Sequence, residues 1–391
     1  MDARTPILAL ATFAAATQTL VFVGVLADLA DALGVSVAVA GQLTSAFALT
    51  FAVSAPLTAS LLAGTERRGL LVVGLLAVSA LNLGAALAPT FEILLGLRVG
   101  AALAGTLVAP VALSAAAALA PPERRGAALA TVLAGFTLAF TLGIPIGSAL
   151  GGAFGWRATF GLASGLALVA AVAIRAVLPR VESEERAGLS NLKAMLAPAV
   201  LAPLSITAGA FLSLFTVFAY IGPVVTRTTG LEGSGVGAMQ AFVGIGSIFG
   251  IILGGRAADR APPRAAVLAC LVTSATSLAL YSAWPTIGDG LPTEARIAGL
   301  AGTILLGAAA LFALGPVVQA RLVEAADGAR NVALATNGSM VFLGQGLGAA
   351  VGGAVISARG VDLLGLVGAS LALLTAGLAF GLPRRRPEAA H

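Results

Sequence analysis

Cysteine, histidine and charge are all scarce in this chain. Its 391 residues include one cysteine and one histidine, and only 10% of them are charged. An average soluble domain carries about 25% charged residues. This chain is 59% hydrophobic, with a mean hydropathy of +1.02. The composition excludes a soluble globular protein and predicts one that lies in a membrane.

The lone cysteine and histidine exclude several kinds of chemistry. Cys270 cannot form an intrachain disulfide, and its apolar neighbours favour a small buried hydrophobic side chain over a reactive thiol. The histidine is His391, the last residue. Intramembrane metalloproteases, haem-binding helices and histidine-dependent acyltransferases need histidine or cysteine inside the bundle. We therefore expect no enzyme activity, no metal and no other cofactor.

Apolar runs separated by short polar breaks predict twelve transmembrane helices. A span needs about 20 apolar residues. The runs are Pro6–Ala27, Ala38–Ala63, Leu70–Leu87, Phe91–Ala120, Ala127–Leu150, Ala158–Leu178, Ala197–Thr226, Gly235–Gly254, Ala265–Trp284, Ile297–Leu322, Asn331–Ile356 and Val361–Leu382. The first run is longer than the apolar core of a signal peptide, so we expect it to be a retained span. The predicted fold class is an all-α membrane protein.

One long charged stretch divides these helices into two sets of six. We predict an N-terminal half, 1–178, a cytoplasmic linker, 179–196, and a C-terminal half, 197–391. A glycine triplet in the fifth helix recurs in the eleventh, so helix n corresponds to helix n+6. The triplets are Gly143, Gly147 and Gly151, and Gly344, Gly348 and Gly352. Such small residues indicate either fixed close packing of helices or a seam along which the halves rock.

Basic residues fall mainly on one side of the predicted bundle. When the loops alternate across the membrane, seventeen Arg and Lys residues lie on one side and four on the other, and Arg98 lies inside a span. Cytoplasmic loops carry the excess of positive charge, so we expect both termini in the cytoplasm. The same bias accounts for the pI near 10.5 without nucleic acid as a partner.

Several segments together resemble a known family. They are Leu26–Ala30 with Leu33–Ser36, Ser54–Leu57, Pro121–Gly126, Gly143–Gly147 with Gly151, Gly155–Arg157, Pro316 with Gln319 and Arg321, and Asn337 with Gly344–Gly353. The chain resembles the drug:proton antiporters of the major facilitator superfamily, particularly the branch of arabinose-efflux and chloramphenicol-exporter proteins. The resemblance covers nearly the whole chain, and its most specific part is the fifth-helix motif.

This resemblance implies twelve helices in two pseudo-symmetric halves that work by alternating access in a bacterial cytoplasmic membrane. It implies export of a small amphipathic compound, such as an amphenicol-type drug, in exchange for protons. The expected partners are the solute, protons and the lipid bilayer, and we expect a monomer. Two other functions stay open: export of a sugar or metabolite, and a membrane receptor or scaffold that transports nothing. The second would more often carry a soluble signalling domain.

The resemblance also indicates where the solute binds. Helices one, four, seven and ten mainly line the cavity in this family, and an apolar pocket with a few amides suits a neutral amphipathic solute. The candidate substrate-binding residues there and on flanking helices are Gln18, Thr19, Phe22, Gln42, Arg98, Phe136, Phe140, Phe215, Phe218, Gln240, Phe312, Gln319 and Asn337. Ordinary packing inside the bundle is the alternative role for any one of these phenylalanines.

The loop after the eighth helix keeps part of the family's cytoplasmic signature. An aspartate near a helix end can pair with a cation in one conformational state only, so we expect Asp259 to act as a latch. A solvated loop charge is the alternative, and in the first half Ala63 occupies the aspartate position. The candidate gating residues are Gly143, Pro145, Gly147, Gly255, Arg256, Asp259, Arg260 and Arg264.

Arg98 is the basic residue well inside a predicted span. A charge there costs about 2.5 to 3.5 kcal/mol on insertion scales. We expect Arg98 to face the cavity and influence proton or substrate binding, or else to be held by backbone carbonyls or by Glu92. Relatives often carry an acidic residue in the first helix, where this sequence has Thr19. The candidate coupling residues are Asp28, Glu92 and Arg98, and proton exchange rests on the resemblance alone.

Overall fold

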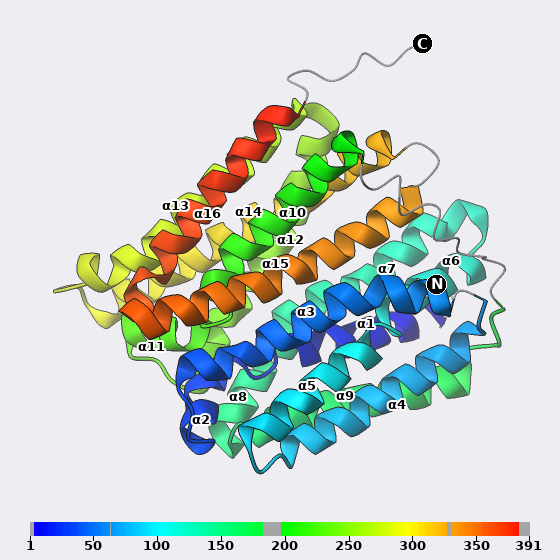
Figure 1. Cartoon of the computed structure of the whole chain (residues 1–391), viewed down its shortest axis with the longest axis horizontal. Coiled ribbons are helices and arrows are strands. Elements are labelled where there is room, and N and C mark those ends of the chain that lie inside the picture. Colours follow the sequence, from blue (N-terminus) through cyan, green and yellow to red (C-terminus); the bar gives the residue numbers. More distant parts are fainter. Residues whose placement is uncertain (1–3, 63, 183–196, 327–329, 383–391) are drawn as a thin grey trace. The chain divides into compact units, whose positions relative to one another are not determined.

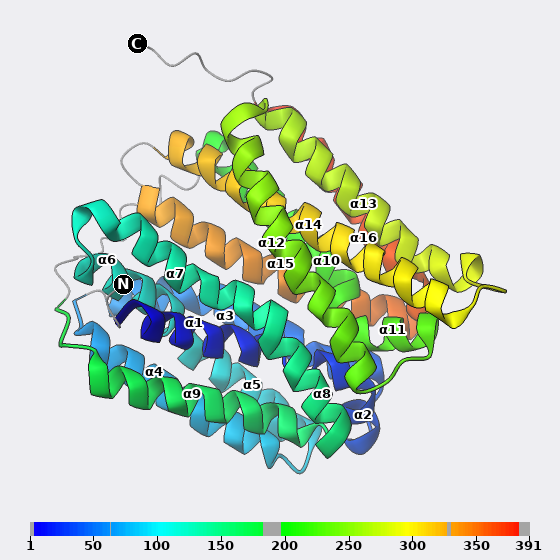
Figure 2. The ribbon, with the colours of Figure 1, turned by 180° about the vertical axis from the view of Figure 1, so that it is seen from behind.

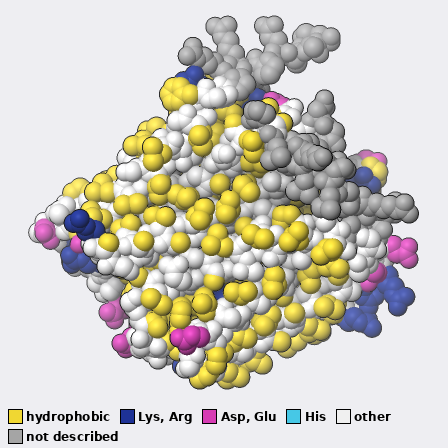
Figure 3. All heavy atoms as spheres, viewed as in Figure 1, with side chains coloured by type: hydrophobic (Ala, Val, Ile, Leu, Met, Phe, Trp, Pro, Cys, Tyr) yellow, Lys and Arg dark blue, Asp and Glu magenta, His cyan; other side chains and the backbone are white. Residues whose placement is uncertain are grey.

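The computed structural model describes residues 4–62, 64–182, 197–326 and 330–382. Every regular element within these ranges is a helix, and twelve helical segments are long and apolar enough to cross a membrane. The predicted all-α fold with twelve spans is therefore confirmed. On the face drawn in Figure 3, hydrophobic side chains cover the flanks of the helices, whereas charged side chains gather near the helix ends. A lipid bilayer requires this distribution because its core cannot solvate charge.

The chain forms two compact units. Unit 1 contains Met1–Gly188 and Leu231–Gly244, and unit 2 contains Leu189–Gly230 and Ile245–His391. Helix α12 (Ser234–Arg260) therefore begins in unit 1 and ends in unit 2. The predicted division of the chain places the whole of this helix in the second half. Most of the predicted linker, 179–196, lies outside the described residues.

Unit 1 holds the first six spans (Figure 1). Its helices are α1 (Arg4–Leu20), α2 (Leu26–Ala32), α3 (Val37–Leu61), α4 (Arg67–Ala86), α5 (Phe91–Gly105), α6 (Ala109–Leu119), α7 (Arg125–Leu138), α8 (Ile144–Phe154) and α9 (Arg157–Val177). Helix α1 packs against α7, and α4 lies along α9 in both ribbon views (Figure 2). Fully buried apolar side chains between α1, α4 and α9, among them Leu8, Leu71 and Ala170, form the core of this unit.

Unit 2 repeats these helix pairings. Its helices, besides the second part of α12, are α10 (Pro198–Phe218), α11 (Ile221–Thr229), α13 (Pro263–Ile287), α14 (Thr293–Ala325), α15 (Arg330–Arg359) and α16 (Leu364–Leu378). Helix α10 packs against α15 as α1 packs against α7, and α13 packs against α16 as α4 packs against α9. The pairings agree with a correspondence between helix n and helix n+6.

Several predicted continuous spans are interrupted. Pro145 has no N–H to donate and its ring crowds the carbonyl four residues earlier, and a π-helical turn, Ala139–Gly143, separates α7 from α8 just before it. The predicted helices Pro6–Ala27 and Ala197–Thr226 are also wrong as continuous elements, because α1 ends at Leu20 and α10 ends at Phe218. Neither of these two ends coincides with a proline, so contacts with other helices must stabilise them.

Candidate functional site

A fully buried arginine lies at the break in the first span. Arg98, on α5, has 0% exposure. Its Nη1 donates to the carbonyl oxygen of Gln18 at 2.8 Å, and its Nη2 donates to that of Thr19 at 2.7 Å. Carbonyl groups in the last turn of a helix lack intrahelical partners, and a cation there is favoured by the helix dipole. Arg98 therefore caps the end of α1, and backbone carbonyls hold its side chain.

Aromatic rings and an amide pair enclose this arginine. Its Cζ lies 4.4 Å from the ring centroid of Phe47 and 5.0 Å from that of Phe22, and such cation–π contacts partly replace lost hydration. Phe22 also stacks on Phe160, with centroids 5.6 Å apart. The side chain of Gln18, whose carbonyl oxygen Arg98 binds, accepts a hydrogen bond at Oε1 from Nδ2 of Asn82 at 2.7 Å. The predicted residues Gln18, Phe22 and Arg98 are thus brought together in one buried polar centre, with Thr19.

Another buried amide of unit 1 comes from α12. Gln240 is 1% exposed, and its Oε1 accepts a hydrogen bond from Oγ of Ser148 on α8. Nε2 of Gln18, Nε2 of Gln240 and Nε of Arg98 are buried donors without a hydrogen-bond partner among the described residues. Such groups are rare in folded proteins. These three nitrogen donors could therefore bind polar atoms of a solute, or water.

Two buried polar contacts of unit 2 join α15 to α10 and to Tyr220, which follows α10. Oγ1 of Thr207 donates to Oδ1 of Asn337 at 2.7 Å, and the Tyr220 hydroxyl donates to the carbonyl oxygen of Ala349 at 2.8 Å. Phe215 contacts Phe211 and Phe218, with ring centroids 6.2 Å and 5.4 Å apart. The predicted residues Asn337, Phe215 and Phe218 are all buried. Their main contacts are with other parts of unit 2.

The remaining predicted substrate residues are more accessible. Gln319 is exposed, and the half-buried ones are Gln42, Phe136, Phe140 and Phe312. They lie on α3, α7, the π-helical turn and α14. Gln42 keeps one local hydrogen bond, from Nε2 to the Ala38 carbonyl oxygen at 3.3 Å. These side chains are therefore less fully enclosed than those of the buried polar centre.

The repeated glycine triplets face the first helix of their own unit. A Cβ atom added at Gly143 or Gly147 would collide with Thr17 or Val21, and one added at Gly348 would lie 2.5 Å from the carbonyl oxygen of Leu212 on α10. The glycines let the two backbones approach closely. The structure shows close packing within each unit, and the rocking seam stays a prediction. Pro145, between the first two glycines of its triplet, is half-buried.

The predicted latch lies at the exposed end of α12. Asp259, Arg256 and Arg260 are exposed and Gly255 is half-buried. Within the ranges that the structure describes, Asp259 takes part in no ion pair. Arg264, at the start of α13, stacks its guanidinium over Phe380 with 4.0 Å between Cζ and the ring centroid. The latch function of this loop therefore stays a prediction.

Within the part of the chain that the structure describes, no buried carboxylate accompanies the candidate coupling residues. Asp28 and Glu92 are both exposed, and neither hydrogen-bonds to Arg98. Among the described residues, the buried charged side chains are Arg98 and Arg321, and Arg321 pairs with Glu324. The structure therefore places no acidic side chain in the described interior, and proton coupling stays a prediction.

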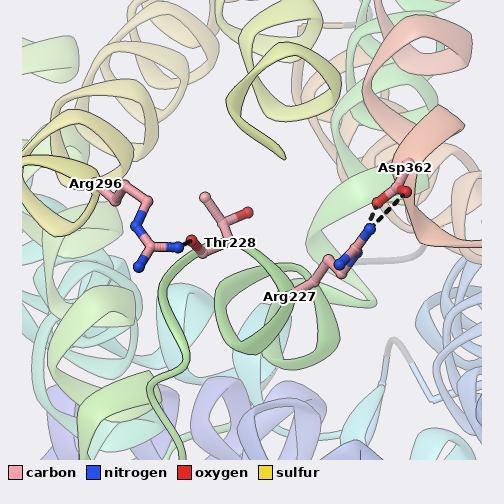
Figure 4. Close-up of polar contacts among 4 residues, drawn as sticks. All are labelled: Arg227, Thr228, Arg296 and Asp362. Carbon is pink, nitrogen blue, oxygen red and sulfur yellow. Dashed lines mark hydrogen bonds and ion pairs between the residues drawn. The ribbon is translucent and has the colours of Figure 1, made fainter. Parts of the chain in front are cut away.

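Two arginines connect the helices at one end of unit 2 (Figure 4). Nε and Nη2 of Arg227 donate to the two carboxylate oxygens of Asp362 at 3.2 Å and 3.3 Å. Nη1 of Arg296 donates to the carbonyl oxygen of Thr228 at 3.4 Å. Arg227 and Thr228 are adjacent on α11, so the contacts join this helix to α14 and to the start of the last span. Like Arg98, Arg296 binds a carbonyl near a helix end.

Sequence reasoning missed three polar partners in these sites. Asn82, Ser148 and Thr207 each contact a residue that the sequence did single out. Their only sequence signal is one polar side chain within an apolar span, which by itself says nothing about the helix that it faces. The close approach of another helix supplies each partner.

Sequence comparison identifies relatives over the whole chain. The profile of the Major Facilitator Superfamily matches residues 8–222 and residues 204–391. The inner membrane transport protein YdhP of Escherichia coli strain K12 is 33% identical over 394 residues, which cover 99% of this chain and 98% of that protein. The chloramphenicol resistance protein of Streptomyces lividans is 34% identical over 351 residues, which cover 88% and 86%.

Solved structures share the fold. A bacterial homolog to the human lysosomal transporter Spinster, inward-facing and unoccupied, superimposes with a TM-score of 0.78 at 16% identity and covers 99% of this chain and 98% of its own. The D-xylose-proton symporter superimposes with a TM-score of 0.75, also at 16% identity, over 97% of each chain. At this identity the likeness shows the fold alone.

Proposed function

Because the chain belongs to the Major Facilitator Superfamily, we propose that this transporter exports a small amphipathic compound by alternating access, in exchange for protons. The observation that carries the proposal is the 34% identity to a chloramphenicol resistance protein over 88% of the chain. An amphenicol-type drug is therefore the first solute to test. The protein lies in a bacterial inner membrane, and the excess of basic residues on one side assigns both termini to the cytoplasm.

We assign solute contact first to the accessible aromatic and amide side chains. Phe136, Phe312 and Gln319 offer rings and an amide at half-buried or exposed positions. Rings bind the apolar part of a solute and amides orient its polar part. The orphan donors of Gln18 and Gln240 supply further hydrogen bonds where a solute reaches them. Neutral donors suit a neutral solute because no net charge has to be matched.

Arg98 acts in this proposal by positioning the first helix. Its two hydrogen bonds hold the carbonyl groups of Gln18 and Thr19 at the end of α1, and Gln18 is itself a candidate solute contact. The arginine thereby sets where the Gln18 amide points. Proton exchange then involves an accessible acid, and the exposed Asp28 and Glu92 are the acids that we assign to it.

Asp259 is proposed as the latch of one conformational state. Its carboxylate is exposed and lies within one turn of Arg256 and Arg260 on α12, so it can pair with a cation when the conformation changes. Asp259→Asn removes the charge and keeps the shape. We expect slower export with unchanged membrane insertion, and an unchanged export rate would remove the latch from the mechanism.

The proposal is tested in an efflux-deficient bacterial host. Cells expressing the chain are compared with empty-vector cells for resistance to chloramphenicol, florfenicol and a panel of other drugs, and for accumulation of radiolabelled chloramphenicol with and without a protonophore. Export predicts higher resistance and lower accumulation, both lost with the protonophore. Phe312→Ala is expected to lower resistance about fivefold, since one aromatic contact is lost.

Phe154→Ala is the matched control for the solute site. Phe154 is 76% exposed, so it tests whether loss of any aromatic side chain has the same effect. Equal loss in both variants would contradict the assignment of solute contact to Phe312. Resistance to no drug, together with export of a labelled sugar, would replace the drug exporter by the sugar or metabolite exporter.

A further inference from the structure

A basic pocket lies in unit 1 where α4 begins and α9 ends. It is open to one side and has a volume of about 240 Å³. The residues that line it are Glu66, Arg68, Gly69, Val72, Val73, Arg175 and Arg180. Three arginines thus converge on one small volume together with two valines. The proposed export function uses none of these residues.

The one acid in the pocket is occupied by backbone groups. Oε1 of Glu66 accepts from the N–H groups of Arg68 at 2.8 Å and Val181 at 3.0 Å, and Oε2 accepts from Gly69 at 2.7 Å. Burial raises the pKa of Glu66, but these N–H groups and the charge of Arg68 outweigh it, so the pKa lies below its ordinary value. Glu66 thus serves as a carboxylate cap of α4 and offsets only part of the positive charge.

Two further hydrogen bonds hold the arginines of the pocket in place. The backbone N–H of Arg67 donates to the carbonyl oxygen of Val181 at 2.9 Å, which fixes the segment that follows α9. Nη2 of Arg68 donates to the carbonyl oxygen of Arg175 at 2.9 Å, which joins the two helix ends. Arg175 and Arg180 are exposed, and neither forms an ion pair with another described residue. Two cations are therefore presented outward from a rigid frame.

Apolar side chains continue from the pocket along both helices. Val73 on α4 and Val172 on α9 are each 60% exposed, and Leu76 and Val169 follow one turn further along. Both helices are transmembrane spans, so these side chains face hydrocarbon while the arginines lie at its boundary. A ligand that is anionic at one end and apolar beyond it matches this surface. A soluble anion would use the arginines and leave the apolar flank unused.

We propose that this pocket binds the phosphate headgroup of an anionic phospholipid, whose acyl chains lie along α4 and α9. Arg175 and Arg180 contact the phosphate, and Arg68 adds positive charge. Basic pockets between transmembrane helices suit such headgroups, because the charges meet in a partly desolvated site. The bound lipid would join the first turn of α4 to the last turn of α9.

The test measures lipid binding to the purified full chain in detergent by native mass spectrometry. Dioleoyl phosphatidylglycerol is titrated against dioleoyl phosphatidylcholine, which has the same acyl chains and no net charge. We expect phosphatidylglycerol to bind more tightly, and Arg175→Gln with Arg180→Gln to weaken it about 30-fold, roughly fivefold per arginine. Arg180→Gln alone, expected to weaken it about fivefold, serves if the double variant does not fold.

Arg124→Gln with Arg125→Gln is the matched control. These two arginines are adjacent and exposed at the start of α7 and do not line the pocket, so this variant should bind phosphatidylglycerol within twofold of the parent. Equal binding of the two lipids, or equal loss in both double variants, would overturn the proposal. Displacement of phosphatidylglycerol by millimolar inorganic phosphate would also overturn it, since the pocket would then take a soluble anion.

Discussion

The two units share their helix pairings but stabilise the break in their first helix differently. In unit 1, α1 ends at Leu20 and the buried cation of Arg98 binds its last carbonyls. In unit 2, α10 ends at Phe218, and the neutral hydroxyl of Tyr220 binds a carbonyl of α15. The repeat thus preserves the packing, whereas the chemistry of the buried centre differs. Within the described residues, the buried Arg98 of unit 1 has no carboxylate partner, whereas the buried Arg321 of unit 2 pairs with Glu324. Unit 1 is therefore the more sensitive one to loss of the polar contacts of its buried cation.

The glycine triplets show what the repeat preserves. Gly147 approaches Val21, the residue that follows α1, and Gly348 approaches Leu212 of α10. Each pair joins the fifth helix of a repeat to its first helix. Because a Cβ atom would not fit at either position, the close approach depends on the absence of a side chain. Packing of this kind tolerates little variation, whereas a buried polar contact can change partner and still be satisfied.

Loss of the buried Arg98 cation is expected to have the largest effect on the free energy of unfolding. Arg98→Met leaves the Gln18 and Thr19 carbonyls unpaired, and each unsatisfied buried group costs about 1 to 3 kcal/mol. We expect the free energy of unfolding, measured by denaturant titration in detergent, to fall by about 3 kcal/mol, with loss of export. Arg296→Met, in unit 2, breaks two long hydrogen bonds, to the Thr228 carbonyl oxygen at 3.4 Å and to the Thr293 hydroxyl at 3.2 Å. Neither is fully buried, so the loss should be about 1 kcal/mol or less. Equal losses would remove the difference between the units.

Overpacking of the glycine contacts should rank second. Gly348→Ala places Cβ 2.5 Å from a backbone oxygen, whereas at Gly147 the nearest atom belongs to the Val21 side chain. Since backbone yields less than a side chain, we expect a loss of about 2 to 3 kcal/mol for Gly348→Ala and about 1 kcal/mol for Gly147→Ala, by the same titration.

The control for the glycine variants lies on the same helix as Gly348. An added Cβ at Gly338 of α15 meets no atom within 4 Å. Gly338→Ala should therefore leave stability unchanged or raise it by up to about 1 kcal/mol, since alanine favours a helix. A larger loss at Gly147 than at Gly348 would contradict the argument that the backbone contact of unit 2 yields less than the side-chain contact of unit 1.

Loss of the Glu66 charge, which caps α4, should have a smaller and pH-dependent effect on local stability. Because its pKa is lowered in the folded protein from 4.5, its stabilising contribution is complete above about pH 4.5 and is lost as the pH falls further. Hydrogen exchange at the Arg68, Gly69 and Val181 amides, corrected for intrinsic rates, should accelerate at low pH in the parent. Glu66→Gln should accelerate it about fivefold at pH 7, consistent with loss of a helix cap, and should weaken this pH dependence.

The loop that corresponds to Glu66 in the repeat supplies the control. Asp259 is exposed and has no ion pair within the described ranges. Asp259→Asn should leave exchange at these three amides unchanged at every pH. Acceleration as large as that of Glu66→Gln would contradict a local cap in unit 1.

The exposed ion pair of unit 2 should have the smallest effect. The side chains of Arg227 and Asp362 are 58% and 48% exposed, and pairs of this kind contribute about 0 to 1 kcal/mol. We expect Arg227→Gln to lower the free energy of unfolding by less than any of the destabilising variants above, and the difference to shrink in 1 M salt. A salt-independent loss larger than that of Arg98→Met would reverse the comparison between the units.

Local patterns in the sequence were enough to predict the spans and their number. An apolar run long enough to cross the bilayer must form a helix there, since every backbone group needs a partner within the segment. The breaks after Leu20 and Phe218 were not predictable. The contacts beside them, of Arg98 with two carbonyls of α1 and of Tyr220 with a carbonyl of α15, join residues that are far apart in sequence. Gln18 and Asn337 were likewise predicted as site residues. Their hydrogen-bond partners, Asn82 and Thr207, were not, because they are distant in sequence.

The sequence by itself determined the fold class, the twelve spans and the family, because hydrophobic length and motif spacing are properties of short segments. Only the tertiary structure decided that Arg98 binds the end of α1, and that the glycine triplets pack inside their own units. It also decided that Glu66 is bound to backbone N–H groups beside three arginines. In each case the partner lies on another helix, and the energy of a buried polar or close-packed contact depends on that partner.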